Sequence, residues 1–208
     1  SSRAILFNKK AEVIEIAQYE FNQFFPKEGW VEHDAIEIWN TQLKAIKDVI
    51  NKSKIDPNEI DSIGITNQRE TTIIWDKQTG EPVYNAIVWQ DRRTASFCDE
   101  LIEKNKTSLI QQKTGLVIDA YFSGTKIKWI LDNNQELREK ANDNKLLFGT
   151  VDTWLIWNLT NGKSHITDPS NASRTLLYNI KDDKWDKDLL DLFDVPENIL
   201  PNVVDSSS

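Results

Sequence analysis

The chain opens on two different hydrophobic patterns. Arg3–Asn8 and Glu12–Phe21 are β-rich runs separated by a polar turn, which predicts two paired strands. A loop at Phe24–His33 follows, and the apolar residues after it recur at helical spacing, which predicts an amphipathic helix. Asp34 stands before that helix and Glu37 three residues later, an arrangement typical of a capping box.

A polar cluster interrupts the next apolar stretch. Ile60–Thr66 is predicted to form a buried strand, and the polar run Asn67-Gln68-Arg69-Glu70 separates it from the β-rich run Thr71–Trp75. Arg69 carries only donors and Glu70 only acceptors, so together they can hold a hydroxylated molecule. The alternative is a surface ion pair on a hairpin. The position at the end of a buried strand, where α/β sheets bind their ligands, favours the binding role.

The remaining pattern mixes strands and helices. Thr71–Trp75 and Tyr84–Trp89 bracket a turn, which predicts a hairpin, and Leu146–Phe148 predicts a short strand. Further helices are predicted at Thr94–Lys104, Ser108–Lys113, Phe122–Asn133, Gln135–Asn142, Asp152–Leu159 and Asp188–Phe193. Strands early and helices late indicate a mixed α/β domain.

Composition excludes several classes of partner. The 208 residues carry a formal net charge of −8 and no long basic run, which argues against nucleic acid or an anionic membrane. No apolar run approaches the roughly 18–20 residues of a membrane span, and no secretory pattern is present. The single cysteine, Cys98, excludes an internal disulfide and is predicted to be a half-buried packing residue. The composition therefore favours a cytoplasmic protein.

Three features predict that the chain is a segment of a larger protein. It begins on Ser1-Ser2-Arg3 directly before an apolar strand, and it contains no methionine. It ends on the soluble tail Asp205–Ser208.

Several polar residues have simpler explanations than chemistry. His33 and His165 have no metal-ligand partner at useful spacing, so we expect both to be structural. Asp152 precedes a predicted helix and is expected to cap it.

Four basic residues are likewise not assigned to catalysis. Arg92-Arg93 resembles a phosphate clamp, but packing at a helix start and pairing with carboxylates are the favoured roles. Lys126 and Lys128 are expected on different helix faces, and neither is assigned to catalysis.

Five blocks in order resemble the FGGY carbohydrate kinases, and within that family the branch that phosphorylates glycerol. The blocks are Asn67–Thr72, Tyr84–Thr94, Gly115–Trp129, Gly149–Trp157 and Asn171–Thr175. Tyr121–Asn133 also fits the pattern of the wider family: an aromatic, a small hydroxyl residue, Lys, then x-x-Trp before polar residues. The resemblance covers Ser1 to about Pro201.

The resemblance implies a fold and a reaction. It implies an actin-like, ribonuclease-H-like N-terminal domain of a two-domain kinase, with residues 1–208 as the acceptor-binding half. The reaction would be transfer from ATP, with Mg²⁺, to glycerol, giving glycerol 3-phosphate. The implied partners are glycerol, ATP or ADP and a C-terminal domain, while the oligomeric state stays open. Alternatives are a family member acting on another polyol or sugar, or a non-catalytic polyol-binding protein.

The resemblance also implies roles for particular residues. Arg69 and Glu70 match the family's glycerol-contacting pair, Tyr121 its phenolic contact, and Trp89 its aromatic wall against the polyol carbons. An indole face with charged and phenolic partners suits a triol, which has C–H faces and hydroxyl rims.

The nucleotide side is expected to be mostly absent from this chain. Ser1 and Arg3 match the end of the family's first phosphate loop, where they would contact ATP. The rest of that loop would lie upstream, and the general base beyond Ser208. The resemblance therefore implies no catalytic residue within the segment, which alone should be inactive.

Overall fold

The computed structural model describes residues 1–207, so Ser208, the last residue of the predicted tail, lies outside the described residues. The strands are β1 (Ser2–Phe7), β2 (Val13–Tyr19), β3 (Glu32–His33), β4 (Ile73–Asp76), β5 (Ala86–Ile87), β6 (Leu146–Gly149), β7 (Ile166–Thr167), β8 (Tyr178–Asn179), β9 (Lys184–Trp185) and β10 (Asn202–Val203). The α-helices are α1 (Ala35–Ser53), α2 (Ala95–Glu103), α3 (Thr107–Thr114), α4 (Ser123–Asp132), α5 (Gln135–Asn142), α6 (Val151–Leu159), α7 (Pro169–Ala172) and α8 (Lys187–Phe193). Two short 3₁₀ helices are η1 (Pro57–Glu59) and η2 (Glu197–Ile199).

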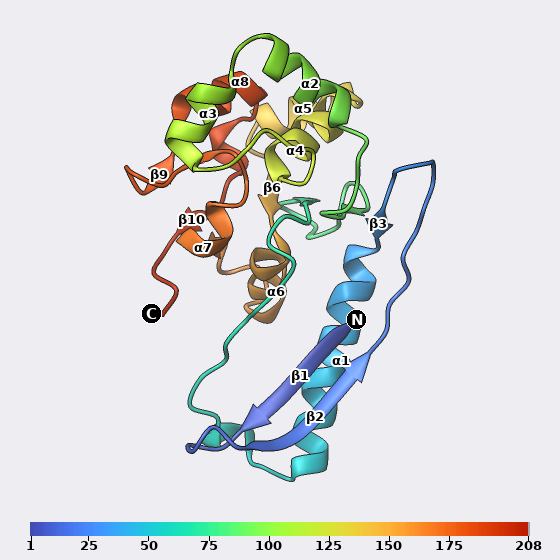
Figure 1. Ribbon diagram of the computed structural model, residues 1–208. Coiled ribbons are helices and arrows are strands. Elements are labelled where there is room, and N and C mark those ends of the chain that lie inside the picture. Colours follow the sequence, from blue (N-terminus) through green and yellow to red (C-terminus); the bar gives the residue numbers. More distant parts are fainter. Residues whose placement is uncertain (208) are drawn as a thin grey trace.

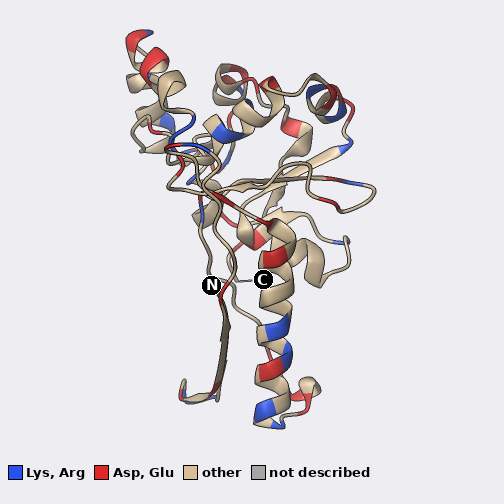
Figure 2. Cartoon of the chain, turned by 90° about the vertical axis from the view of Figure 1, so that its right-hand side faces the viewer, with Lys and Arg blue, Asp and Glu red and all other residues tan. Residues whose placement is uncertain are grey.

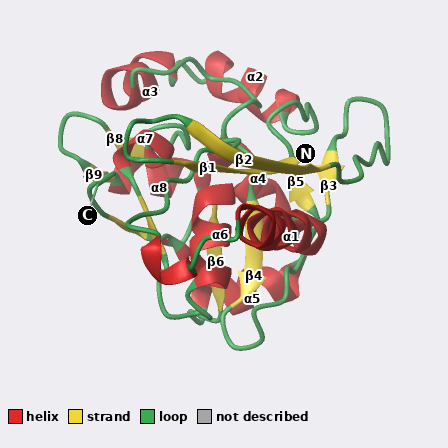
Figure 3. Ribbon diagram, turned by 90° about the horizontal axis from the view of Figure 1, so that it is seen from below, coloured by secondary structure: helices red, strands yellow, loops and turns green. Residues whose placement is uncertain are grey.

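The N-terminal hairpin confirms the first predicted strand pair. β1 and β2 run antiparallel, with Ala4 opposite Ala17, and α1 lies along one face of the pair (Figures 1 and 3). Ala17, Ala45 and Val49 form the small core between the hairpin and the helix. The opposite face of the hairpin exposes the apolar side chains of Ile5, Phe7, Ile14 and Ile16.

Helix α1 begins where the sequence predicts, but the capping box is only half formed. The Asp34 side chain accepts hydrogen bonds from the backbone N–H of Ile36, at 2.8 Å, and of Glu37, at 3.3 Å. The Glu37 carboxylate binds Asn22 instead of returning to Asp34. The reciprocal bond was therefore a wrong prediction, because a neighbouring chain segment competes for the same carboxylate. Both signs of charge follow α1 along its length (Figure 2).

The predicted strand at Ile60–Thr66 is absent. The segment has no regular structure and links α1 to β4 as a long connection (Figure 1), with the Ile63 side chain 68% exposed. A strand exists through the ladder it makes with a neighbour. No strand within residues 1–207 pairs with this segment. The apolar, β-rich composition of this segment therefore indicates a preference for an extended backbone, but it does not show whether another strand pairs with it.

The central pair of strands joins distant parts of the sequence. β4 and β6 run antiparallel, with Ile74 opposite Phe148, and both strands are almost completely buried. The predicted hairpin is present in part, since Thr72 and Ile87 exchange backbone hydrogen bonds of 2.9 and 3.0 Å. Glu32–His33, expected to lie in a loop, instead forms β3 and pairs with β5.

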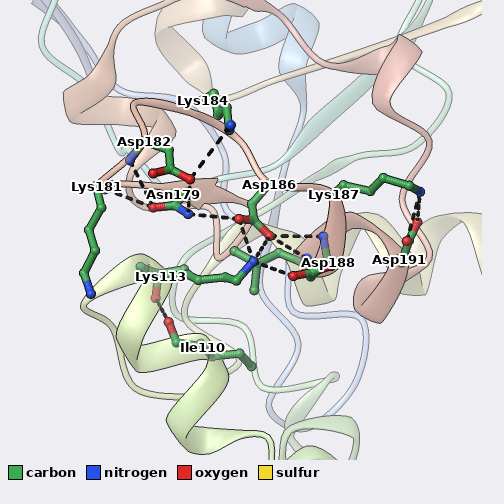
Figure 4. A network of polar contacts seen from close by, with 12 residues as sticks. Ile110, Lys113, Asn179, Lys181, Asp182, Lys184, Asp186, Lys187, Asp188 and Asp191 are labelled. Atoms are coloured by element: carbon green, nitrogen blue, oxygen red, sulfur yellow. Dashed lines mark hydrogen bonds and ion pairs between the residues drawn. The ribbon is translucent and has the colours of Figure 1, made fainter.

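Helices cover this pair and enclose the main hydrophobic core. Ile127 of α4, Leu131 of α4 and Phe193 of α8 pack in one buried cluster with β4 and β6. Lys113 joins α3 to the start of α8. Its Nζ lies 2.7 Å from Asp186 Oδ1 and 2.6 Å from Asp188 Oδ2 (Figure 4). The pairing raises the pKa of Lys113, chiefly through its hydrogen bond to Asp186.

Two details differ from the predictions. Asp152 does not cap α6, because Thr150 is the N-cap residue and Asp152 lies inside the first turn. Its carboxylate accepts from the hydroxyls of Thr150 and Thr167, and burial raises its pKa. Cys98 is fully buried rather than half-buried, and burial raises its pKa to about 11. None of the described helices combines the length and apolar character that crossing a bilayer requires.

Candidate functional site

Two of the predicted site residues lie against each other. Trp89 follows β5 and Tyr121 precedes α4, and their ring centroids are 5.4 Å apart with a tilt of 58°. Both side chains are half-buried, so each ring keeps an accessible surface. A tilted aromatic pair of this kind offers flat apolar faces beside a phenolic hydroxyl.

Trp89 is held by a closed turn. The backbone N–H of Asp91 donates to the carbonyl of Val88 at 3.0 Å, which closes the turn around Trp89. The buried Asp91 carboxylate accepts from the backbone N–H of Val31 at 2.6 Å. The turn is therefore anchored to the segment before β3.

Arg93 neutralises that carboxylate in the interior. Its side chain is completely buried, and its Nη2 lies 2.8 Å from Asp91 and 2.7 Å from Glu32. The guanidinium stacks 3.8 Å from the ring centroid of Trp30 and 4.7 Å from that of Trp129. A planar cation suits both contacts, because its edges donate while its faces stack. Arg93 is thus structural, as the sequence favoured, and supports the turn that carries Trp89.

Glu70 is buried and paired with a cation that the sequence did not assign. The residue is 4% exposed, and its Oε1 accepts from Arg174 Nε at 2.7 Å. The Arg174 guanidinium lies 4.9 Å from the Phe122 ring centroid and 5.8 Å from that of Tyr121. Arg174 therefore connects Glu70 to the aromatic pair. Its only sequence signal is its presence in one of the recognised blocks.

A close backbone approach brings Arg174 to this position. The N–H of Gly124, in the first turn of α4, donates to the Thr175 carbonyl at 2.7 Å. A Cβ at Gly124 would lie 2.8 Å from the same oxygen, so only glycine fits without displacement. Ser123 also donates its hydroxyl to the Glu70 carbonyl at 3.2 Å. The start of α4 thus joins the Glu70 and Arg174 segments.

Arg69 does not share the surroundings of Glu70. Its side chain is exposed, and its one described contact is a 3.5 Å donation to the Ser170 carbonyl. The two neighbours therefore do not form an ion pair with each other. Arg69 keeps its donors free toward solvent while Glu70 is held by Arg174.

Ser1 and Trp89 line one hollow of about 260 Å³. Its other lining residues are Glu20, Phe21, Gln23, His33, Gln68, Val88 and Gln90. Arg3 lies outside this hollow, exposed on β1, where its Nε donates to Gln18 at 2.7 Å. The structure thus brings Ser1 near Trp89 but pairs Arg3 with the neighbouring strand.

The histidines have no arrangement suited to a metal. Burial lowers the pKa of His33 to about 4, so its ring is neutral near pH 7, and its Nδ1 has no hydrogen-bond partner within residues 1–207. His165 contacts the Phe148 carbonyl, and burial lowers its pKa as well. Within the described part of the chain, no cluster of three His, Cys, Asp or Glu residues could hold a metal ion.

The comparisons with known proteins cover the whole chain. The N-terminal domain of the FGGY family of carbohydrate kinases matches residues 1–208. Glycerol kinase 1 of Clostridium tetani (strain Massachusetts / E88) is 62% identical over 207 residues, and the glycerol kinase of Bacillus cereus (strain AH187) is 60% identical over the same length. Each alignment covers 100% of this chain and 42% of the relative, so the chain spans less than half the length of these relatives.

Solved structures agree with the sequence match. The structure of Plasmodium falciparum glycerol kinase with ADP superposes with a TM-score of 0.92 at 38% identity, covering 97% of this chain and 40% of that one. A gluconate kinase from Lactobacillus acidophilus superposes at 0.86 with 22% identity, covering 97% and 39%, which shows the shared fold. The sequence match and both superpositions agree, and the chain belongs to the FGGY family of carbohydrate kinases, as an N-terminal domain of that family.

Proposed function

We propose that this chain is the acceptor-binding half of an ATP-dependent glycerol kinase. The complete protein would transfer the γ-phosphoryl group of ATP to a terminal hydroxyl of glycerol, giving glycerol 3-phosphate. Sequence identity of 60–62% over the whole chain to proteins named glycerol kinase is the observation that carries the proposal. The ribonuclease-H-like character of the domain and its extent over residues 1–208 belong to the same proposal.

The chemistry of the site supports a small polyol as the acceptor. Trp89 and Tyr121 offer apolar faces for the C–H groups, and Glu70 offers a carboxylate for the hydroxyls. Arg174 orients the Glu70 carboxylate, while the exposed Arg69 has donors free toward solvent. A site that pairs buried polar groups with hydroxyls rejects molecules that lack them, because the buried groups would be left unpaired.

The phosphoryl transfer itself depends on groups other than Glu70, Trp89 and Tyr121. Such transfers rely on positioning and on electrostatic stabilisation of the moving phosphoryl group. Ser1 and Arg3 are the two residues that we assign to the nucleotide side, and the general base is assigned beyond Ser208. Within residues 1–207, no three His, Cys, Asp or Glu side chains are placed to hold Mg²⁺.

Replacing Trp89 tests the aromatic wall. In the full-length protein, Trp89→Ala should raise the Michaelis constant for glycerol at least about tenfold, equivalent to roughly 1.4 kcal/mol, because the polyol carbons lose their apolar surface. The Michaelis constant for ATP should change less than about twofold. Steady-state kinetics with each substrate varied in turn measures both.

Trp157→Ala is the matched control, since Trp157 is another half-buried tryptophan but packs against Trp75 in the second core cluster. It should lower stability while leaving both Michaelis constants near their original values. A folded Trp89→Ala protein with unchanged glycerol dependence would remove Trp89 from the site.

A further inference from the structure

A lysine ammonium is buried beneath the turn that carries Tyr121. Lys126 of α4 is 0% exposed, and its Nζ donates to three backbone carbonyls. The distances are 2.8 Å to Ala120, 2.6 Å to Tyr121 and 3.1 Å to Phe122. An ammonium group has three donors and no acceptor. Every donor of Lys126 is therefore used on this one turn.

The carboxylates near Lys126 are each paired with an arginine. The acidic groups that act on it from neighbouring segments are Asp91, Glu70, Asp119 and the thiol of Cys98. Each carboxylate is already paired, Asp91 with Arg93, Glu70 with Arg174 and Asp119 with Arg92. Burial lowers the pKa of Lys126 to about 7, against the opposing effect of these acids. Burying the Lys126 ammonium group therefore costs free energy, and none of the nearby carboxylates depends on Lys126 for an ion pair.

The three carbonyls explain why a cation is needed. They belong to consecutive residues, and all three oxygens lie within 3.1 Å of one nitrogen. Carbonyl oxygens that converge in the interior repel one another and are costly to bury without a donor. The N-cap residue of α4, Phe122, makes no side-chain capping hydrogen bond. On the far side, the Asp119 carboxylate accepts from the Tyr121 N–H at 2.7 Å.

We propose that Lys126 is a positioning residue for Tyr121: its ammonium group gathers the carbonyls of Ala120, Tyr121 and Phe122 and so sets the phenol against Trp89. The inference deepens the proposed function, since it assigns the support of the acceptor pocket to a lysine that touches no substrate. It also explains why Lys126 is among the buried residues of α4, together with Ile127 and Ile130.

The test compares two lysines of the same helix in the full-length protein. Lys126→Met keeps an unbranched side chain that is one bond shorter and removes all three donors. Lys128→Met removes a partly exposed lysine that pairs with Asp132 at 2.8 Å. Lys126→Met should raise the Michaelis constant for glycerol at least about tenfold while that for ATP changes less than about twofold. Lys128→Met should change neither.

A second readout needs no substrate. Amide hydrogen exchange at Tyr121 and Phe122 should become at least about tenfold faster in Lys126→Met, because the turn opens more often. If Lys126→Met does not fold, Lys126→Gln replaces it. The glutamine amide keeps two donors on a side chain one bond shorter, and effects in the same direction are expected.

The two readouts separate this inference from the proposed function. If the unaltered protein does not phosphorylate glycerol, the proposed function fails, and the exchange measurement still decides whether Lys126 holds the turn. Unchanged exchange at Tyr121 and Phe122 in a folded Lys126 variant would overturn the inference. So would equal changes in the Michaelis constants for glycerol and ATP, which would indicate a general structural role.

Discussion

Glu70→Gln in the full-length protein is expected to reduce kcat/KM for glycerol at least about 100-fold, equivalent to roughly 2.7 kcal/mol. The substitution keeps the shape of the side chain but removes the charge that faces Arg174 and exchanges one acceptor for a donor. Arg69→Ala should have an effect of the same order, through loss of donors to the substrate oxygens. Nucleotide binding measured without glycerol should remain near normal.

Glu100→Gln is the control, because Glu100 forms an exposed ion pair that contributes little to stability. Glu100 lies 3.7 Å from Lys104 on α2, and both side chains are more than half exposed. Such a pair contributes roughly 0–1 kcal/mol, so the substitution should barely change catalysis or stability. The proposed roles fail if Glu70→Gln and Arg69→Ala both fold, bind ATP and phosphorylate glycerol within a few-fold of the unaltered protein.

Arg93→Met should lower the free energy of unfolding of the 208-residue chain by about 3–5 kcal/mol, the usual cost of leaving a buried charge unpaired. The loss affects two carboxylates at once, because Arg93 is the cation for both Glu32 and Asp91. It also removes the planar group between Trp30 and Trp129. Urea unfolding followed by tryptophan fluorescence measures the change.

The neighbouring arginine provides a matched control. Arg92 pairs with Asp119 at 2.6 Å, but its side chain is 52% exposed. Arg92→Met should therefore cost at most about 1 kcal/mol. Similar losses for the two variants would show that the buried network contributes no more than a surface pair, which would contradict the account given for Arg93.

Local signals in the sequence predicted local structure well. Asp34 was identified as the start of α1 because an N-cap and the helical spacing after it lie within one short stretch. The β1–β2 hairpin was predicted for a similar reason, since both strands and their turn are contiguous. The strand predicted at Ile60–Thr66 was wrong because pairing requires a second segment, which composition does not reveal.

The candidate site depends on contacts between residues that are far apart in the sequence, and the sequence alone does not show which of them meet. Glu70 and Arg174 are 104 residues apart, and Glu32 and Arg93 are 61 apart, so neither pair follows from spacing. Trp89 and Tyr121 were named from family resemblance, and their contact became visible only in the fold. Lys126 has a usable signal in its position, because a lysine near the start of a helix can reach the backbone carbonyls of the turn before it.

The most direct test of the account is the substrate preference of the full-length protein that contains this chain. Formation of phosphorylated product from ATP should be measured with glycerol, and in parallel with gluconate, which is named for a structural neighbour, and with the sugar xylulose. We expect kcat/KM for glycerol to exceed that for either of the others by at least about 100-fold, with glycerol 3-phosphate as the product. A protein that phosphorylates xylulose or gluconate as well as glycerol, or that phosphorylates none of the three, would contradict the account.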